Sequence, residues 1–258
     1  MKAQGVPLSE WNLAINYGIK TGFNDAFIIS AEKKDELIAA DPKSAEIIRP
    51  ILRGRDIKRY EYNFADLWLI ATFPSRHYDI NDYPAIKEHL LSYSIERLEQ
   101  TGKKYTIDGV EVKARKKTSN KWFETQDSIS YWNEFSKQKI VYREISDAMD
   151  ACLVGPEYML NNKCYLITGE HLIYILSYLN SKLFTKIMLQ QANVTGGKGE
   201  GFLSAISLIP PTDEIESNIV KIYNNLSNDP DSSSTELDIV FCDLYGLTME
   251  ERRFILDT

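Results

Sequence analysis

Apolar residues recur along the chain with two different periods, and these periods divide it into strands and helices. Runs rich in β-branched and aromatic residues, which are typical of strands, are "WNLAINYG", "DAFIIS", "DLWLIATF", "KIVYREI", "ACLVG" and "CYLITG". Apolar positions at helical spacing mark "AEKKDELIAADPKSAEII", "YPAIKEHLLSYSIERLEQTG" and "HLIYILSYLNSKLFTKIMLQ". The Asp-Gly pair between "KYTI" and "VEVK" predicts a β-hairpin. Together these patterns predict an α/β (mixed α+β) fold, in which a twisted mixed β-sheet carries packed helices.

The pattern changes after Pro211. The stretches "SNIVKIYNNL" and "STELDIVFCDLYGLTMEERRFIL" have the spacing of two amphipathic helices, and the polar loop "SNDPDSSS" joins them. We therefore expect a main domain over residues 1–211 and a C-terminal helical appendage over residues 212–258.

The charge of the chain is unevenly distributed. The formal net charge is −7, which by itself argues against a polyanionic partner. Residues 1–211, however, contain 27 Lys and Arg against 26 Asp and Glu, whereas residues 212–258 contain 3 against 11. Two stretches of the main domain are basic, namely "RPILRGRDIKR" at residues 49–59 and residues 103–121. A basic stretch is either a solvated face or a site for an anionic partner such as nucleic acid, and charge alone leaves both open.

Cysteine and histidine usage indicates neither a disulfide framework nor a zinc site. The three cysteines and three histidines are scattered, without paired or metal-ligand spacing. The N-terminus has no apolar segment of signal-peptide type, and no apolar run is long enough to cross a bilayer. We therefore expect a soluble, cytoplasmic protein with no membrane partner.

Two stretches resemble catalytic motifs only in part. The glycine-rich loop at residues 196–201 contains Lys198, but Gly rather than Ser or Thr follows that lysine, and Ala192 stands where a phosphate-binding loop begins with Gly. Lys198 is therefore expected, at most, to position a phosphate.

The second partial motif is "DGVEVK", in which Asp108, Glu111 and Lys113 loosely match a metal-dependent nuclease site. A charged hairpin explains the same residues, because the spacing is too compressed for ligands on two adjacent strands. No nucleophile elbow is present, and the histidines have no Ser or Cys partner at motif spacing. We therefore assign no catalytic residue and no metal site to this chain.

The loop "GIKTGFND" interrupts two apolar stretches with small and polar residues. Its glycines allow close backbone approach, and Lys20, Thr21 and Asn24 offer hydrogen-bond donors suited to phosphates or base edges. A recognition or clamping loop and an ordinary turn both fit this stretch.

Several motifs, taken in order, resemble one protein family. They are "GIKTGFNDAFII", "IIRPILRGRDIKRY", "YPAIKEHL", "WNEF", "KQKIVYREIS", "YILSYLNSKLF" and "SLIPP", and they run from about Gly18 to Pro211. This series resembles the TaqI-like C-terminal specificity domain, the target-recognition region of adenine-specific DNA methyltransferases and of type IIG restriction–modification enzymes. The resemblance implies that the chain recognises a double-stranded DNA sequence in a restriction–modification or phage-defence system.

In such enzymes an N-terminal module binds S-adenosylmethionine and methylates a flipped-out adenine through an Asn/Asp-Pro-Pro-aromatic motif. This chain lacks that motif, since its single Pro-Pro pair stands in "IPPT". The resemblance therefore implies that no cofactor binds this chain itself. It also implies that a methyltransferase module, with or without a nuclease, lies in the same full-length protein or in a separate subunit.

The resemblance and the local charge together give the expected DNA-binding residues. Trp132 in "YWNE" is expected to be either a core anchor or an aromatic that stacks on a base. Asp56 is expected to orient an arginine. The expected DNA contacts are Lys20, Thr21, Asn24, Arg53, Arg55, Lys58, Arg59, Lys113, Arg115, Lys116, Lys117, Arg143 and Lys198.

Two other functions remain open from the sequence. The chain could be a docking subunit, in which the acidic helical tail binds a partner protein. It could also be an enzyme with a cryptic metal-dependent nuclease site. Duplex-DNA affinity that falls steeply with salt would favour the DNA-recognition reading.

Overall fold

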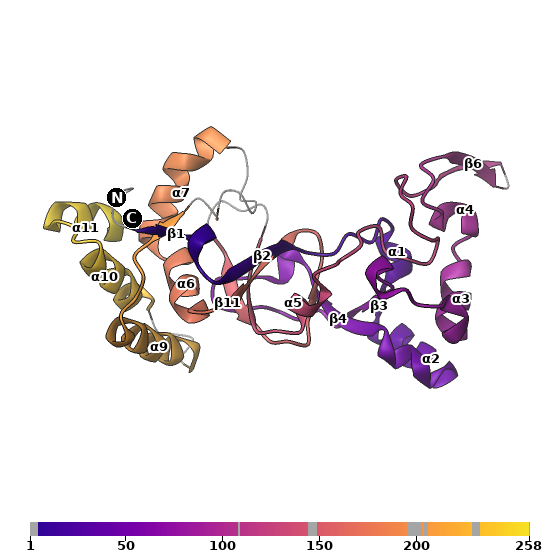
Figure 1. Cartoon of the computed structure of the whole chain (residues 1–258), viewed down its shortest axis with the longest axis horizontal. Helices are drawn as coiled ribbons and strands as arrows, with labels where there is room; N and C mark the ends of the chain where they lie inside the picture. Colours follow the sequence, from indigo (N-terminus) through magenta and orange to yellow (C-terminus); the bar gives the residue numbers. More distant parts are fainter. Residues whose placement is uncertain are drawn as a thin grey trace.

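The computed structural model describes residues 5–107, 109–143, 149–195, 203, 206–228 and 233–257. The molecule is elongated, with three helices of the C-terminal region at one end and the β6–β7 hairpin at the other (Figure 1). The strands are β1 Val6–Pro7, β2 Leu13–Tyr17, β3 Ile28–Ser30, β4 Ile48–Leu52, β5 Leu67–Ile70, β6 Lys104–Ile107, β7 Val110–Lys113, β8 Lys139–Arg143, β9 Ala151–Val154, β10 Met159–Leu160, β11 Cys164–Gly169 and β12 Ser207–Leu208. The α-helices are α1 Asn24–Phe27, α2 Ala31–Ala40, α3 Pro84–Leu91, α4 Ile95–Leu98, α5 Trp132–Phe135, α6 Leu172–Leu179, α7 Lys182–Thr195, α9 Asp213–Asn228, α10 Thr235–Leu244 and α11 Met249–Leu256.

An antiparallel sheet in the order β2-β11-β8-β9 forms the middle of the molecule. Successive side chains of a strand point to opposite faces, and here both faces are covered. Val141 and Leu166 belong to one hydrophobic core, while Ile140 and Ile167 belong to a second core on the other face. This double burial explains why these strands are nearly continuous apolar runs.

A second four-stranded sheet lies in the first core, in the order β10-β4-β5-β3. Strand β10 runs parallel to β4, whereas β3 and β4 pair antiparallel with β5. The mixed α/β class predicted from the sequence is therefore confirmed. In the described part of the chain, the remaining strands form two separate pairs, β1 with β12 and β6 with β7.

The second core joins the helices of the C-terminal region to the middle sheet. Helices α9, α10 and α11 bury Ile219, Phe241 and Ile255 together with residues of α6 and α7. The second core contains apolar residues from both sides of residue 211. The domain boundary expected at that residue stays a prediction.

Two long helices predicted from periodicity are each interrupted. The run at residues 83–102 divides into α3 and α4, and Ser94 between them has a positive φ of 66°. The run at residues 171–190 divides into α6 and α7; Asn180 ends α6, and its side chain exchanges two hydrogen bonds with the backbone of Ala151. Both predictions are therefore corrected from one helix to two.

Two further sequence predictions change at their ends. The run "DAFIIS" begins as the short helix α1 rather than as a strand, and only its last three residues form β3. The second helix predicted after Pro211 divides into α10 and α11 at Gly246, where φ is 61°. Thr248 then caps α11 through a capping box with Glu251. No helix in the described part is long and apolar enough to span a membrane.

Candidate nucleic-acid interface

The loop after β2 is held by close backbone contacts. Gly18 lies so near β10 that a Cβ atom on it would meet the Asn161 carbonyl oxygen at 1.9 Å, so no side chain fits there. Ile19 forms a parallel bridge with Asn161, and Gly22 has a positive φ of 79°. The glycines therefore shape this loop, as the sequence suggests, and they fix its path against the neighbouring strand.

The polar residues of this loop divide into internal and exposed groups. Thr21 is buried; its hydroxyl donates to the Asn24 side chain at 2.7 Å and accepts from the Phe23 amide at 3.2 Å. The expectation that Thr21 contacts DNA is therefore corrected, because its hydroxyl closes the turn instead. Lys20 and Asn24 are exposed.

Arg115 packs directly behind the same loop. Its side chain is 2% exposed, and its guanidinium donates to the backbone carbonyl oxygens of Leu98, Thr21, Glu124 and Trp122 at 2.6–2.9 Å. Burial lowers the pKa of Arg115 to about 10, and the nearby charge of Arg97 acts in the same direction. The expected DNA contact by Arg115 is therefore corrected as well, because this cation is buried and joins the loop to two other segments.

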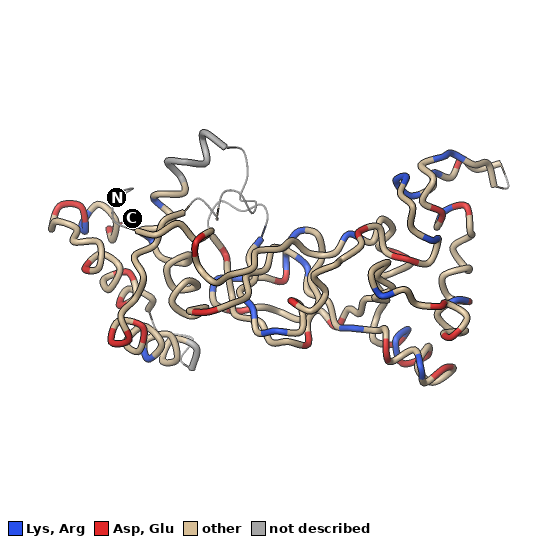
Figure 2. Tube along the Cα trace, viewed as in Figure 1, with Lys and Arg blue, Asp and Glu red and all other residues tan. Residues whose placement is uncertain are grey.

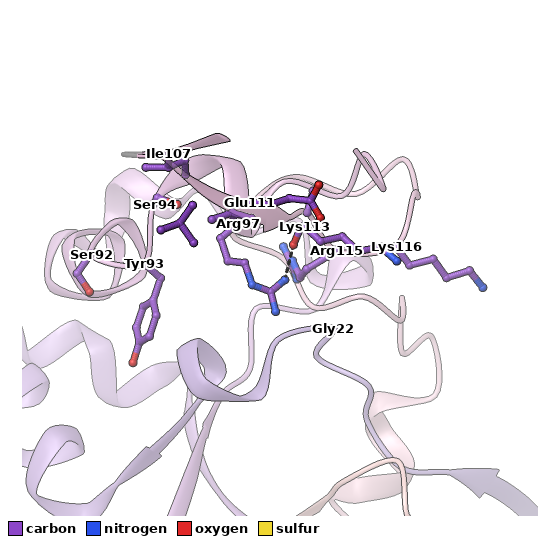
Figure 3. Close-up of a pocket in the computed structure, with 13 residues that line it drawn as sticks. Gly22, Ser92, Tyr93, Ser94, Arg97, Ile107, Glu111, Lys113, Arg115 and Lys116 are labelled. Atoms are coloured by element: carbon purple, nitrogen blue, oxygen red, sulfur yellow. Dashed lines mark hydrogen bonds between the residues drawn. The ribbon is translucent and has the colours of Figure 1, made fainter. Parts of the chain in front are cut away.

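Arg115 thereby connects the loop to the second basic stretch. A pocket of about 740 Å³ lies between Gly22, the turn after α3 and the β6–β7 hairpin (Figure 3). Figure 3 shows Tyr93, Arg97 and Lys116 around this pocket, with the hydrogen bond from Arg97 to the Lys113 carbonyl oxygen drawn dashed. The Arg97 guanidinium also lies 4.0 Å from the centroid of the Phe23 ring.

Four lysines near this pocket form what we call the lysine rim: Lys20, Lys113, Lys116 and Lys117. All four are exposed, and none has a salt bridge or side-chain hydrogen bond within the described residues. Carboxyl groups also lie nearby: Glu111 lines the same pocket, and the Asp127 amide donates to the Lys20 carbonyl oxygen at 3.3 Å. Burial raises the pKa of Asp127, while the charges of Lys20 and Lys116 oppose that rise. The rim is therefore a cluster of solvated cations suited to phosphate contacts.

The first basic stretch is mostly engaged within the protein. Arg53 forms a two-pronged pair with the buried Asp56, at 2.9 and 2.7 Å. Arg59 donates to the Asn180 carbonyl oxygen and to the Ser234 hydroxyl, and so ties this stretch to the C-terminal helices. Arg55 and Lys58 are exposed, with no side-chain partner in the described part of the chain. The expected role of Asp56 in orienting an arginine agrees with this geometry.

Asn161 links the first basic stretch to the loop. Its side-chain oxygen accepts from the Gly54 amide at 3.2 Å, and its backbone contacts Gly18 and Ile19. The adjacent Lys163 is exposed and lies against Gly54, a cation that charge clustering in the sequence did not reveal.

The remaining expected residues lie elsewhere. Arg143, on β8, pairs with Asp150. Lys198 and the glycine-rich loop lie outside the described residues, as does Asp108 of the nuclease alternative. Glu111 of that alternative pairs with Lys104 across the hairpin at 2.9 Å. Within the described part of the chain, no three His, Cys, Asp or Glu side chains gather as a metal-ligand set.

Comparison with known proteins identifies the family. The model of the TaqI-like C-terminal specificity domain matches residues 49–198. Among solved structures, the chain is similar to the type IIL restriction–modification enzyme MmeI in complex with DNA, with 18% identity and a TM-score of 0.57 over 98% of this chain and 36% of that chain. It is also similar to the type IIG restriction endonuclease BpuSI, with 12% identity and a TM-score of 0.54 over 99% of this chain and 30% of that chain.

These two likenesses concern the fold, and the chain spans about a third of the length of each enzyme. A comparison with curated proteins finds none that matches. The family match covers more than half of the chain and includes both basic stretches and the strands β8, β9 and β11 of the middle sheet. The chain therefore belongs to the TaqI-like C-terminal specificity domain family.

Proposed function

We propose that this chain binds double-stranded DNA and selects its sequence, as the target-recognition part of a restriction–modification or phage-defence enzyme. The family itself is defined as a specificity domain, and one of the similar solved structures, that of MmeI, is a complex with DNA. The proposal assigns the phosphate contacts to the lysine rim, Arg55, Lys58 and Lys163.

The observation that carries this proposal is the position of the lysine rim around the loop. Lys20 comes from the loop after β2, whereas Lys113, Lys116 and Lys117 come from residues almost a hundred positions later. The buried Arg115 brings the two segments together through its hydrogen bond to the Thr21 carbonyl oxygen. Solvated lysines on a rigid scaffold suit a polyanion, because each phosphate contact releases condensed counterions.

Much of the negative excess of the chain lies away from this contact, because residues 212–258 contain 3 Lys and Arg against 11 Asp and Glu. Figure 2 shows Asp and Glu along α9, α10 and α11, at the end of the molecule away from the hairpin, and also among the Lys and Arg of the hairpin end. A net charge of −7 is therefore compatible with a locally basic DNA-binding surface, because screening limits the acidic end to short-range effects.

Methyl transfer, in this proposal, belongs to a module outside the 258 residues. That module would bind S-adenosylmethionine and modify an adenine, and the present chain would hold the DNA in register for it. The sequence of the chain contains no Asn/Asp-Pro-Pro-aromatic motif, which is consistent with this division of labour. The module can be part of the same polypeptide or a separate subunit, and cytoplasmic DNA would be the substrate.

Docking of α11 on that module is a second candidate function, compatible with the first. Met249 and Phe254 on α11 are 80% and 65% exposed, next to Glu250 and Glu251. A groove of about 380 Å³ between α7 and α11 lies beside them. Exposed apolar residues flanked by charges are typical of an interaction surface.

Salt dependence of DNA binding tests the proposed function. The purified chain, alone and with a methyltransferase module of its own system, is titrated into labelled duplex DNA at several salt concentrations. We expect affinity for duplex DNA that falls steeply with salt. Absence of duplex binding at low salt in both arrangements would leave only the docking function.

A further inference from the structure

Among the described residues, four arginine side chains lie over aromatic rings, and one of them has its donors available. Arg59, Arg97 and Arg115 each donate hydrogen bonds to protein oxygens. Arg76 is exposed, and its guanidinium carbon lies 4.0 Å from the centroid of the Trp132 ring. In the described part of the chain, no hydrogen bond or ion pair uses the Arg76 side chain. Its five N–H donors are therefore free to meet a ligand.

A shared acceptor fixes Arg76 relative to Trp132. The carbonyl oxygen of Ile129 accepts from the Ser75 hydroxyl at 2.9 Å and from the Trp132 amide at 3.2 Å. The Ser75 amide also donates to the Ser128 carbonyl oxygen at 3.3 Å. The backbones that carry the arginine and the tryptophan thus bond to the same peptide segment, and neither can shift without breaking one of these contacts.

Ile129 is itself in an unfavourable backbone conformation. Its φ is +50°, which a β-branched residue rarely adopts and which costs on the order of 1–3 kcal/mol. Its side chain is 1% exposed and belongs to the first hydrophobic core. Core packing therefore maintains the strained turn that places Trp132 beneath Arg76.

Arg76 lies close to the lysine rim along the same segment. The amides of Gln126 and Asp127 donate to the Lys20 carbonyl oxygen, while Ser128 and Ile129 contact Ser75. The loop that carries Lys20 and the segment that carries Arg76 therefore bond to neighbouring residues of the stretch 126–129. A few residues of chain span at most about 10 Å, which is within the width of the DNA major groove.

We propose, building on the proposed DNA-recognition function, that Arg76 is a base-reading residue and that Trp132 positions it. The ligand is the major-groove edge of a guanine, whose N7 and O6 acceptors match the two-pronged donor geometry of a guanidinium. The lysine rim holds the adjacent phosphates and contributes no base preference.

The stacked geometry favours a base edge over a phosphate. A free arginine side chain loses considerable rotamer freedom on binding, whereas stacking on Trp132 restricts Arg76 beforehand and leaves the edge of its guanidinium plane free. Phosphate contacts gain less from such restriction, because a flexible lysine already satisfies them. The stacked Arg76 guanidinium is therefore suited to reading a base, and the flexible lysines of the rim are suited to binding phosphates.

The test is selection of binding sites from a random duplex pool by the full chain and by Arg76→Ala. We expect the motif selected by the unaltered chain to contain a G·C pair that becomes unspecified with Arg76→Ala, with about 5- to 150-fold loss of discrimination at that pair. Replacing that guanine by 7-deazaguanine, which lacks the N7 acceptor, should weaken binding of the unaltered chain and leave the variant unaffected.

Trp132 is tested through the same base pair. Trp132→Leu should lower discrimination at that pair while the rest of the motif is retained, whereas Trp132→Phe should preserve most of it. A purely structural role for Trp132 would weaken binding to all sequences equally. Arg253→Ala is the matched control, because Arg253 is an exposed arginine on the acidic helix α11 and should leave the motif unchanged.

Two outcomes would overturn the proposal, and they are distinguishable from failure of the function on which it rests. An unchanged motif with Arg76→Ala overturns base reading by Arg76 but leaves DNA recognition standing. Equal weakening of all sequences, with a shallower salt dependence, would instead make Arg76 a phosphate contact and overturn the proposal in the same way. Absence of duplex binding by the unaltered chain would overturn the proposed function and this inference together.

Discussion

The Arg115 guanidinium donates a hydrogen bond to the carbonyl oxygen of Thr21 over 2.9 Å, although 94 residues separate the two in the chain. The same cation contacts three other carbonyl oxygens and lies 5.0 Å from the Phe27 ring centroid. Neutral backbone oxygens, rather than a carboxylate, thus accept the hydrogen bonds of this buried guanidinium. Arg115 therefore links the loop after β2 directly to the second basic stretch.

Replacing Arg115 should destabilise the fold and displace the loop. Arg115→Met keeps much of the volume but leaves three buried carbonyl oxygens and one part-buried carbonyl oxygen without this donor, and each buried loss costs about 1–3 kcal/mol before relaxation. We expect the free energy of unfolding to fall by roughly 3–5 kcal/mol in urea titrations. The control is Lys117→Met, an exposed neighbour, which should change stability by less than about 0.5 kcal/mol. Equal effects of the two variants would contradict the structural role of Arg115.

Neutralising the lysine rim should weaken DNA binding in a sequence-independent way. Each lysine that contacts a phosphate contributes about 0.9 to the slope of log affinity against log salt. The triple variant of Lys20, Lys113 and Lys116 to Ala should therefore lower that slope by roughly 2–3. Lys221→Ala on the acidic helix α9 is the matched control and should leave the slope unaltered. An unchanged slope in the triple variant would remove the rim from the DNA-binding surface.

Enlarging Gly18 should separate the loop from β10. Its added methyl group would lie 1.9 Å from the Asn161 carbonyl oxygen, and that backbone atom cannot turn aside as a flexible side chain would. We expect Gly18→Ala to cost about 1–3 kcal/mol or more of unfolding free energy, measured by urea denaturation. Amide hydrogen exchange should also accelerate at Ile19, whose amide donates to Leu160. Wild-type protection at Ile19 in this variant would contradict the close approach.

Lys139 should make stability depend on pH in alkaline solution. It is completely buried, its ammonium donates to the carbonyl oxygens of Phe135, Lys137 and Gly155, and burial lowers its pKa to about 8 from an ordinary value of 10.5. Between these values the unfolded chain binds this proton and the folded chain does not. Stability therefore rises with pH across this window, by up to about 3 kcal/mol from this group.

The comparison with Lys139→Met isolates that contribution. The free energy of unfolding is measured for both proteins from about pH 7 to about pH 11. As pH rises, the unaltered chain should become more stable relative to the variant. The other titrating groups are common to both proteins and cancel. A difference that stays constant across this range would show that Lys139 keeps its ordinary pKa in the folded state.

Periodicity predicted most of the elements but not where they stop. The strands β5, β8 and β11 follow from apolar runs, and the hairpin of β6 and β7 follows from the Asp-Gly pair between its strands. The breaks after α3 and α6 do not follow from those runs, and the contact that Asn180 makes with Ala151 beside the second break is a tertiary one. Local patterns contain no information about such distant partners.

The candidate site was predictable in charge but not in exposure. Charge clustering located three of the four lysines of the rim, yet it could not separate the exposed Lys116 from the buried Arg115 next to it. Charge clustering also missed Arg76, because this arginine lies outside both basic stretches. Its availability depends on Trp132, which is 56 positions away in the chain. Charge density along a sequence therefore locates a surface, whereas burial and pairing decide which of its residues can act.

Selection of binding sites from a random pool of duplex DNA tests the central claim most directly. The purified chain, alone and with a methyltransferase module of its own system, is incubated with the pool at low and at physiological salt, and the retained DNA is sequenced. The proposed function predicts enrichment of one motif, with affinity that falls steeply as salt rises. Retention of no duplex DNA, or retention without any preferred sequence, would contradict it.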